Sequence, residues 1–538
     1  MLLRKRKQLF NNQFILLTIS KFTLMKKLFV CALALAAFVA CDKEPNVGGG
    51  DEAGKVYMKF SVKMETTRTG TDTNPESPSD ATPDIEVGYD EENTVSKVDI
   101  VLANADSYVV AKNVVPEGSG DTYIASFSSL ELKASTAYDV YIYANCSAPE
   151  ALSLDATSEV AVADMTQNNL FWMTNAYEAN EVTMPADMSV YTSPSSPLNL
   201  GAHFVERSMA RFDFMPKNDN EFELADGVTV TLTEAAIINH SKAFYTFRRV
   251  SADGTNANWT VGGVETPQNY VVDVDYAAKA DGYTEAQVAN FDAHLTLPST
   301  WTWKSIASAD LTKADNWEGE DDGKTDYDGE HSLNDYYFWQ YAKENTIPGV
   351  NAQEHGISTG IVFKGQIAST NDKVTAAMAK KEMIYVFENI LYGGWADVEA
   401  AAADAKAPAT LVAAVNKVKA VEAPTSADYA KAGFTGYSAD ADGNYFTYYY
   451  YWNRHNDNGD NVTMGKMEFA VVRNNVYKLC VDKISKLGHP TPSDPTDPDP
   501  DPDPDPVDPT DPDEELNYYF NVTVKVLPWV VRVNHIEF

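Results

Sequence analysis

The chain has 538 residues, enough for two or three domains with real hydrophobic cores. It carries 42 Lys and Arg against 78 Asp and Glu, a formal net charge of −36 at pH 7. A surface of that sign argues against binding to nucleic acid and against electrostatic attachment to anionic lipid, because both need positive charge.

Residues 1–41 have the pattern of an export signal. A basic segment at residues 25–27 precedes an apolar segment of 13 residues at 28–40, which is too short for a permanent membrane helix. Residues 38–41 (FVAC) form a lipobox with phenylalanine where leucine is usual, and they predict acylation of Cys41. Two alternatives stay open, namely an ordinary secretory peptide cleaved elsewhere and a start at Met1 or at Met25. Removal of residues 1–41 leaves 35 basic against 78 acidic residues, a net of −43, which suits an exported surface protein.

A half-buried strand is predicted at residues 56–64, where apolar and polar residues alternate. Its apolar face holds Val56, Met58, Phe60, Val62 and Met64. Residues 66–93 follow, rich in Gly, Pro, Asn and Asp, and predict an exposed loop. Arg68 lies in this loop and is the only arginine between Cys41 and Arg207. A protease specific for arginine is therefore expected to remove the first strand and little else.

Short strand signals separated by turns continue along the chain, a spacing typical of a β-sandwich. In the first half they lie at residues 95–102, 108–115, 123–127, 138–144, 171–173, 181–184 and 204–214. A second β-rich region begins near Val228, with later strands at residues 445–452, 466–473 and 476–484. Residues 372–432 are a predicted helical insertion, with Ala-rich helices at 374–392, 396–407 and 409–420. Strands and helices do not alternate, so a nucleotide-binding parallel sheet is not expected.

Residues 489–515 are dominated by Asp-Pro repeats, which predict an extended, polyproline-like spacer about 75 Å long. Beyond the spacer, residues 518–526 alternate like the first strand, with Tyr518, Phe520, Val522, Val524 and Val526 on the apolar face. Two outcomes stay open for this terminal strand. It folds back onto its own domain, or it reaches a second copy and fills the groove that the first strand leaves.

No common catalytic sequence motif is present, and no metal or cofactor is predicted. Residues 440–444 begin like a calcium loop, but Tyr445 and Tyr451 stand where an EF-hand needs glycine and glutamate, so a hairpin turn is predicted. His455 is a candidate ligand or base, with a structural or solvent-exposed role as the simpler alternative.

Two further questions stay open from the sequence. Cys146 and Cys480 either form a disulfide or remain free thiols. Acidic loops with aromatic residues, such as residues 326–337, suit glycan or calcium binding as well as plain solvation.

The C-terminal pattern resembles that of a known family. Residues 448–457 (YYYYWNRHND) and 467–479 (MEFAVVRNNVYKL) resemble the C-terminal region of Bacteroidetes major fimbrial subunits, the fimbrillins. The Asp-Pro spacer and residues 524–529 (VKVLPW) are similar to the same family. Looser matches lie at residues 56–68, 95–102, 141–145 and 207–211.

This resemblance implies a non-enzymatic, mainly β protein with two transthyretin-like β-sandwich domains. It implies an outer membrane lipoprotein precursor that is cleaved by an arginine-specific protease, between Arg68 and Thr69, and becomes part of a cell-surface fimbrium. The donor segment extends from Tyr518 to Trp529. Implied partners are other copies of the chain and related fimbrial subunits, the protease, the lipid anchor before maturation, and a host protein or glycan.

The expected organisation therefore has five parts. They are a lipoprotein signal peptide (1–41), an N-terminal β-sandwich domain that loses strand 56–64 (42–218), a C-terminal β-sandwich domain with the insertion at 372–432 (219–488), the spacer (489–515) and the donor strand (516–538). We expect a fimbrial stalk subunit. The alternatives are a monomeric surface lipoprotein that binds glycan and an anchor or accessory fimbrial subunit.

Overall fold

The computed structural model describes residues 55–64, 88, 90–119, 122–129, 131–167, 170–262, 270–312, 335–455, 458–460, 462–492, 507–514, 521–522, 525–528 and 531–537. The chain divides into Met1–Lys55, of which only Lys55 is described, and Val56–Phe538, whose fold follows. Strands dominate this unit, and the predicted mainly β fold class is confirmed. Among the described helices, none combines the length and the apolar character of a membrane span.

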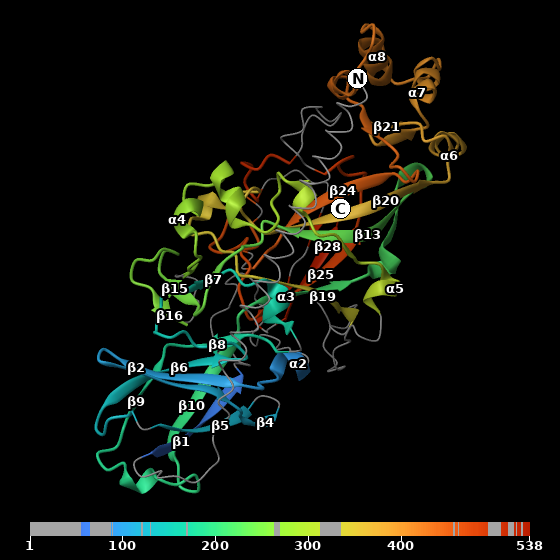
Figure 1. The fold of residues 1–538 in the computed structure, drawn as a ribbon. Helices are drawn as coiled ribbons and strands as arrows, with labels where there is room; N and C mark the ends of the chain where they lie inside the picture. The colour runs from blue at the N-terminus through green and yellow to red at the C-terminus, as the bar shows by residue number, and fades with distance from the viewer. Residues whose placement is uncertain are drawn as a thin grey trace, which may run out of the picture. The chain divides into compact units, whose positions relative to one another are not determined.

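Nine strands of the N-terminal part form one sheet (Figure 1), in the order β3-β2-β6-β8-β10-β1-β5-β4 with β9 beside β6. Each strand predicted between Val56 and Met184 is found within a few residues of its expected limits. The strands are β1 (Val56–Met64), β2 (Val98–Asn104), β3 (Ser107–Val114), β4 (Glu117–Ser119), β5 (Thr122–Ser129), β6 (Ala137–Ala144), β8 (Met173–Asn175), β9 (Asn180–Thr183) and β10 (Leu198–Arg207).

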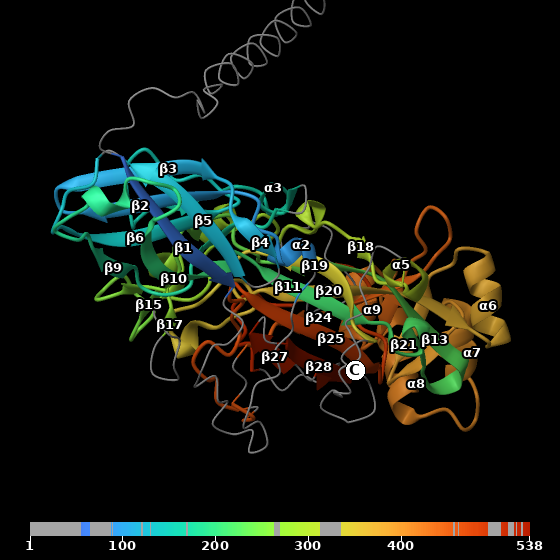
Figure 2. The same cartoon turned by 90° about the horizontal axis from the view of Figure 1, so that it is seen from below.

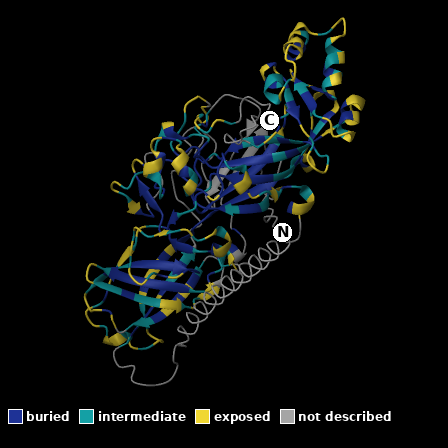
Figure 3. Ribbon diagram, turned by 45° about the horizontal axis from the view of Figure 1, so that its top comes forward, coloured by how far each residue is buried: buried dark blue, intermediate teal, exposed yellow. Residues whose placement is uncertain are grey.

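Two further sheets enclose the core of the C-terminal part. The first has the order β19-β11-β25-β28-β26 with β27 beside β25, and the second has the order β12-β13-β20-β24 with β18 beside β13. Phe214 and Leu479 of the first sheet share one buried cluster with Phe363 and Tyr449 of the second. Figure 3 draws the central strands of the C-terminal part mostly in the colour of buried residues. The strands are β11 (Ala210–Met215), β19 (Tyr337–Ala342), β25 (Asn475–Lys483), β26 (Asn521–Val522), β27 (Lys525–Pro528), β28 (Val531–Glu537), β12 (Glu221–Glu223), β13 (Val228–Ile238), β18 (Lys304–Ser305), β20 (Gly360–Ser369) and β24 (Phe446–Trp452).

Short elements fill the connections. They are the strands β7 (Thr157–Ser158), β14 (Phe244–Tyr245), β15 (Arg249–Ser251), β16 (Thr260–Val261) and β17 (Tyr270–Val271), the helices α2 (Asp90–Asn93), α3 (Val162–Met165), α4 (Tyr276–Lys279) and α5 (Ser308–Leu311), and the 3-10 turns at Ser189–Tyr191, Lys217–Asn220, Ala225–Gly227, Glu285–Asn290, Pro298–Thr300 and Val350–Ala352.

The single strand predicted at residues 204–214 is wrong, because the chain changes sheets inside it. β10 ends at Arg207 and β11 begins at Ala210 in the other sheet. Between them, the Ser208 N–H donates to the Trp172 carbonyl at 2.9 Å and the Met209 carbonyl accepts from the Asn474 N–H at 2.8 Å. The change of sheet therefore precedes the predicted domain limit at residues 218 and 219, and the domain limits stay predictions.

The insertion at residues 372–432 is largely helical, as predicted. Figure 1 draws its helices beyond the ends of β20 and β24. It contains α6 (Asp372–Ala379), α7 (Trp395–Ala402), α8 (Ala409–Lys419) and α9 (Ser426–Lys431), and a small sheet of β21 (Ile384–Phe387), β22 (Ile390–Tyr392) and β23 (Thr435–Tyr437). The helix predicted over 374–392 is wrong beyond Ala379, because β-branched and aromatic residues favour strands and Glu388 and Asn389 adopt the positive φ values of 48° and 65° in the turn.

The strand predicted at residues 466–473 is also wrong. Met467 has a φ of 55°, and Val471 makes only an isolated bridge to Asn345. Side chains, and not a neighbouring strand, provide hydrogen-bond partners for this backbone. The Phe469 N–H donates to Gln353 Oε1 at 2.9 Å, and Asn453 Nδ2 donates to the Ala470 carbonyl at 2.7 Å.

Both cysteines of the described chain, Cys146 and Cys480, are free and buried. Burial raises the pKa of the Cys146 thiol to about 12, which makes it unreactive at neutral pH.

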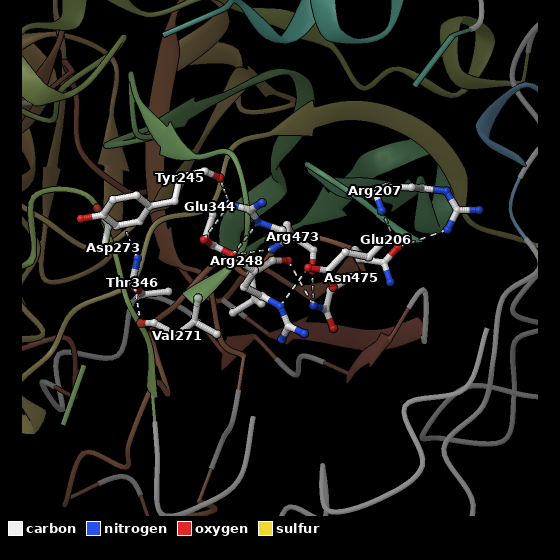
Figure 4. A network of polar contacts seen from close by, with 12 residues as sticks. Glu206, Arg207, Tyr245, Arg248, Val271, Asp273, Glu344, Thr346, Arg473 and Asn475 are labelled. Carbon is white, nitrogen blue, oxygen red and sulfur yellow. Dashed lines mark hydrogen bonds and ion pairs between the residues drawn. The ribbon is translucent and has the colours of Figure 1, made fainter. Parts of the chain in front are cut away.

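Buried arginines fix the loops around the sheets (Figure 4). Arg473 donates to the Tyr245 carbonyl at 2.7 Å and pairs with Glu344 at 3.2 Å. Arg248 pairs with Glu206 at 3.0 Å. Because a buried charge is costly unless it is paired, these contacts favour one arrangement of the loops.

Arg211 of β11 forms the most deeply buried of these ion pairs. It lies 2.8 Å from Glu92 of α2 and 2.8 Å from Asp213, and all three side chains are at most 1% exposed. Tyr341 also donates to Glu92, at 2.7 Å. Helix α2 is thereby fastened to β11 and β19.

Replacement of Arg211 by Ala is expected to lower the free energy of unfolding by about 3 to 5 kcal/mol, because Glu92 and Asp213 lose their guanidinium partner while buried. Chemical denaturation measures the loss. The matched control is Lys112→Ala, which breaks an exposed ion pair with Glu150 of similar length, 2.6 Å, and should leave stability unchanged. Equal losses in the two variants would contradict this account.

Candidate functional site

Strand β1 lies inside its sheet and not at an edge. It pairs with β5 antiparallel, from Val56↔Ser129 to Lys63↔Thr122, and with β10 parallel, from Met58↔Leu198 to Met64↔Val205. Figure 2 shows it running between these two strands. In the strand order, β1 links β5 and β4 to the rest of the sheet. Its removal would leave two facing rows of unpaired backbone groups, which we call the β1 slot.

The apolar face of β1 lies in the core, as predicted. Val56, Met58, Phe60 and Val62 are between 0 and 5% exposed. The Phe60 ring packs edge-on against Phe127 of β5 and His203 of β10, with centroid distances of 6.1 and 5.5 Å. Burial of four such side chains contributes about 6 to 12 kcal/mol before opposing terms. An empty β1 slot would therefore favour a strand with the same apolar pattern.

The C-terminal strand differs from its prediction. The sequence predicts one strand over 518–526, whereas the structure has β26 and β27 there as short pieces and a longer strand, β28, beyond them. Pro528 ends β27, because proline has no N–H to continue the ladder. Of the predicted donor residues, Val522 lies in β26 and Val526 in β27, while Tyr518, Phe520, Val524 and Trp529 lie outside the described residues.

β28 folds back onto its own chain. It pairs parallel with β25, from Val476↔Val531 to Lys483↔Glu537, and antiparallel with β26. β1 also has one parallel and one antiparallel neighbour. The first strand and the last therefore occupy the same kind of position, in two different sheets.

Part of the segment predicted as an extended spacer, residues 489–515, is docked on the rest of the chain. The Gly356 N–H donates to the Pro509 carbonyl at 2.8 Å, the His355 N–H to the Asp511 carbonyl at 3.0 Å, and the Asp513 N–H to the Gln353 carbonyl at 3.1 Å. We call residues 507–514 the strap and residues 353–356 the dock. A side chain on Gly356 would place its Cβ 2.8 Å from the Pro509 oxygen and 2.2 Å from the Tyr283 ring, so only glycine allows this approach.

Three carboxyl groups gather around one cation at the end of the strap. Arg454 Nη1 lies 2.5 Å from Glu468 and 2.7 Å from Glu514. Asp513 is 6% exposed, and neither of its carboxyl oxygens has a hydrogen-bond partner among the described residues. Burial raises the pKa of Asp513 well above its ordinary value. Burial also raises the pKa of Glu468 to about 9, with Arg454 opposing the shift and Glu514 adding to it.

Two other candidates have structural roles. His455 is 1% exposed, and its Nδ1 shares a hydrogen bond of 2.9 Å with the Tyr477 hydroxyl. The Asp440 carboxylate accepts the backbone N–H groups of Asp442, Gly443 and Asn444 at 2.8 to 2.9 Å, which lowers its pKa and forms the predicted turn. The described residues contain no group of three or more side chains placed to hold a metal ion.

Three predicted sites lie outside the described residues. They are the acylated Cys41, the cleavage position at Arg68 and Thr69, and residues 326–334 of the acidic, aromatic loop. Acylation, cleavage and glycan or calcium binding therefore stay predictions.

Residues 444–535, from β24 to β28, match the family model described as major fimbrial subunit protein type IV, fimbrillin, C-terminal. The chain carries a fimbrillin C-terminal region. Over these residues, the match confirms the fimbrillin resemblance recognised from the sequence. The fimbrillin region includes the strap, Arg454 and Glu468 as well as the terminal strands.

No curated protein matches the chain. Among solved structures, a candidate cell adhesion protein from Parabacteroides distasonis has 11% identity and a TM-score of 0.37, with 89% of this chain and 97% of that chain covered. A fimbrilin from Porphyromonas gingivalis has 14% identity and a TM-score of 0.36, with 88% and 98% covered. A candidate cell adhesion protein from Bacteroides eggerthii has 12% identity and a TM-score of 0.36, with 90% and 99% covered. At TM-scores below 0.5, these likenesses support no further conclusion.

Sequence reasoning missed the strap and its contacts with the fimbrillin region. One signal was available, because Val507 interrupts the strict Asp-Pro repeat of residues 497–506. Val507 packs against the buried cluster that contains Trp301 and Trp452. Arg454 and Glu468 belong to segments quoted for the family resemblance, but their spacing does not reveal that they meet the strap.

Replacement of Phe60 by Ala is expected to lower the free energy of unfolding by about 3 to 5 kcal/mol, because it opens a cavity between β5 and β10. Ser61→Ala on the opposite face of β1 is the control and should change stability by less than about 0.5 kcal/mol. Denaturant unfolding of the uncleaved protein compares the two variants. A small loss for Phe60→Ala would argue against a tightly packed β1 slot.

The free energy of unfolding is expected to fall as pH rises from about 5 to 9. With a folded-state pKa of about 9, Glu468 keeps a proton that the unfolded chain releases above the ordinary glutamate pKa, so deprotonation favours unfolding. Glu468→Gln cannot ionise and should show a weaker dependence on pH. Denaturant unfolding at pH 5, 7 and 9 tests this, and identical pH profiles for both proteins would contradict it.

Proposed function

We propose that this chain is a stalk subunit of a cell-surface fimbrium that supports adhesion. It is exported as an outer membrane lipoprotein acylated at Cys41, cleaved after Arg68, and polymerised when residues 518–529 of one copy fill the β1 slot of the next. The family match over residues 444–535 supports the fimbrial role and, with it, self-association at the cell surface.

The position of β1 is the observation that carries the assembly mechanism. Because β1 has a hydrogen-bonded neighbour on each side, its loss creates a slot and not merely an exposed edge. A strand with the same alternation can restore both ladders and the apolar core, as in other strand-addition systems.

Cleavage gives the exchange its direction. Exchange of one apolar strand for a similar one gains little free energy by itself. Once cut, β1 loses the high effective concentration that a covalent link provides, whereas the incoming strand remains tethered to its own subunit. The contact is head-to-tail and does not close, so repetition yields a filament.

The burial of other arginines supports cleavage at Arg68. Five described arginines are at most 3% exposed, namely Arg207, Arg211, Arg248, Arg249 and Arg473, and the side chain of Arg454 is 16% exposed and paired with Glu468 and Glu514. A protease cannot seat such residues while the protein is folded. Arg68 lies instead in a segment whose composition predicts an exposed loop.

The pairing of β28 with β25 favours a second candidate function. A terminal strand that stays on its own chain suits a monomeric surface lipoprotein that binds glycan, or an anchor or accessory fimbrial subunit that keeps its lipid. Under either alternative, cleavage at Arg68 does not produce polymers.

Treatment of residues 42–538 with an arginine-specific protease is expected to expose Thr69 as the new N-terminus and to produce SDS-resistant ladders and filaments. Arg68→Lys is the matched control, because the charge stays while the protease loses its site. N-terminal sequencing, gel electrophoresis and electron microscopy give the readouts. Excess peptide of residues 518–538 should shorten the ladders by occupying free slots.

A cleaved protein that stays monomeric, under conditions in which a known fimbrillin polymerises, would overturn the assembly mechanism and favour the second candidate. Ladders that form equally well with Arg68→Lys would place the trigger elsewhere. Deletion of residues 518–538 should abolish the ladders without preventing cleavage.

A further inference from the structure

We propose that the dock is a binding site for an extended, acidic, proline-containing peptide, and that its occupant is the chain's own strap. We further propose that this docking holds the terminal strand on its own subunit, so that the strap must leave the dock before the strand is donated. The second half rests on the proposed strand exchange.

The backbone contacts explain why the strap contains proline. Pro509 and Asp511 each present a carbonyl to the dock, and Asp513 presents its N–H. Pro512 faces Glu354 in an antiparallel bridge, and the flanking hydrogen bonds make this a non-hydrogen-bonded pair. The ladder needs no N–H at this position, so proline at 512 costs no hydrogen bond.

Side chains add charge selection to this backbone pairing. Arg454 binds Glu514 at 2.7 Å, and the guanidinium of Arg454 lies 4.7 Å from the centre of the Phe469 ring. Gly356 leaves room for the Pro509 carbonyl. The Glu354 carboxylate accepts a hydrogen bond of 2.7 Å from the Tyr283 N–H through one of its two oxygens. The surface thus fits a peptide that has a carboxylate side chain at the position of Glu514.

Docking limits how far the terminal strand can travel. With the strap held as far as Glu514, about four residues lead to Tyr518 and span at most about 14 Å. When the strap is released, the arm begins near Pro492, and about 26 residues span about 80 Å. Strap release therefore increases the reach of the donor about sixfold.

A disulfide between positions 354 and 512 tests both halves of the proposal. Residues in such a non-hydrogen-bonded antiparallel pair have Cα atoms about 4.5 Å apart, which is within the range that a disulfide spans. The variant carries Glu354→Cys and Pro512→Cys in the full mature chain. The single variants Glu354→Cys and Pro512→Cys are the controls, and the native thiols of Cys146 and Cys480 are buried.

The site itself is judged before any cleavage. Mild oxidation of the uncleaved monomer should cross-link positions 354 and 512 almost completely, as shown by a non-reducing peptide map. A monomer that keeps its native circular dichroism but forms no cross-link would overturn the dock as the site of the strap. This readout does not depend on polymerisation.

The second half of the proposal is tested after cleavage with an arginine-specific protease. We call the docked strap, which holds the terminal strand on its own subunit, the latch. The oxidised double variant should assemble at least tenfold more slowly than the same protein after reduction, while both single variants assemble alike with and without reductant. Equal rates for the oxidised and reduced forms would overturn the latch. If wild-type protein does not assemble at all, the proposed function fails and the latch with it, and the cross-link alone still decides the site.

A second variant tests the latch without cysteine. Glu514→Gln removes the charge that pairs with Arg454 and keeps the size of the side chain, and it should speed assembly up to about tenfold by loosening the strap. Glu422→Gln makes the same change at an exposed carboxylate of the helical insertion, outside the strap and the dock, and should leave the rate unchanged. Slower assembly of Glu514→Gln, or equal acceleration by both variants, would contradict the role assigned to Arg454.

Discussion

The backbone hydrogen bonds on both sides of β1 are the constraint on which the rest of this structure depends. An edge strand can leave a sheet and expose one row of polar groups to water. β1 cannot leave in that way, because β5 would lose its ladder to the rest of the sheet and the core would lose Met58, Phe60 and Val62. Under the proposed assembly, the same feature makes β1 necessary before cleavage and its replacement favourable afterwards.

The distribution of charge limits how copies of this chain can associate. The chain carries a net charge of −36, and the buried arginines are matched by buried carboxylates. Subunits with this net charge repel one another, so their association has to overcome that repulsion. Burial of apolar side chains and backbone pairing can do so, and a strand inserted into a slot provides both.

The sequence predicts this fold well where one rule governs a segment. Alternation finds β1, and runs of strand-forming residues find β6 and β25, because each pattern is consistent over several residues. Local pattern fails at Ser208 and Met209, where strand-forming residues continue although the chain changes sheets. The neighbouring strand is determined there by contacts with Trp172 and Asn474, which are distant in the sequence. Local pattern fails again at residues 384–392, where helix formers merge into a strand-forming run.

The slot and the strap differ in how far local pattern determines them. The inward face of β1 follows from its alternation, but its central place in the sheet depends on β5 and β10, which only the fold brings together. The strap is bound by the dock and by Arg454, segments that are far from it in the chain. Neither arrangement can be deduced from spacing, because each pairs segments across a long stretch of chain.

A terminal strand with two alternative positions needs a control that lies outside the strand. The proposed donor segment, residues 518–529, contains β26 and β27, which pair antiparallel with β28 and β25 in cis, whereas a β1 slot would offer it one parallel and one antiparallel neighbour. Contacts outside the strand can bias which of the two positions it takes. In the strand exchange proposed above, donation of the terminal strand would cost the strap its three backbone hydrogen bonds and its Arg454 contact, which would bias the uncleaved subunit toward the cis position. The Asp-Pro repeat before the strap would then supply length, and release of the strap would determine when that length is used.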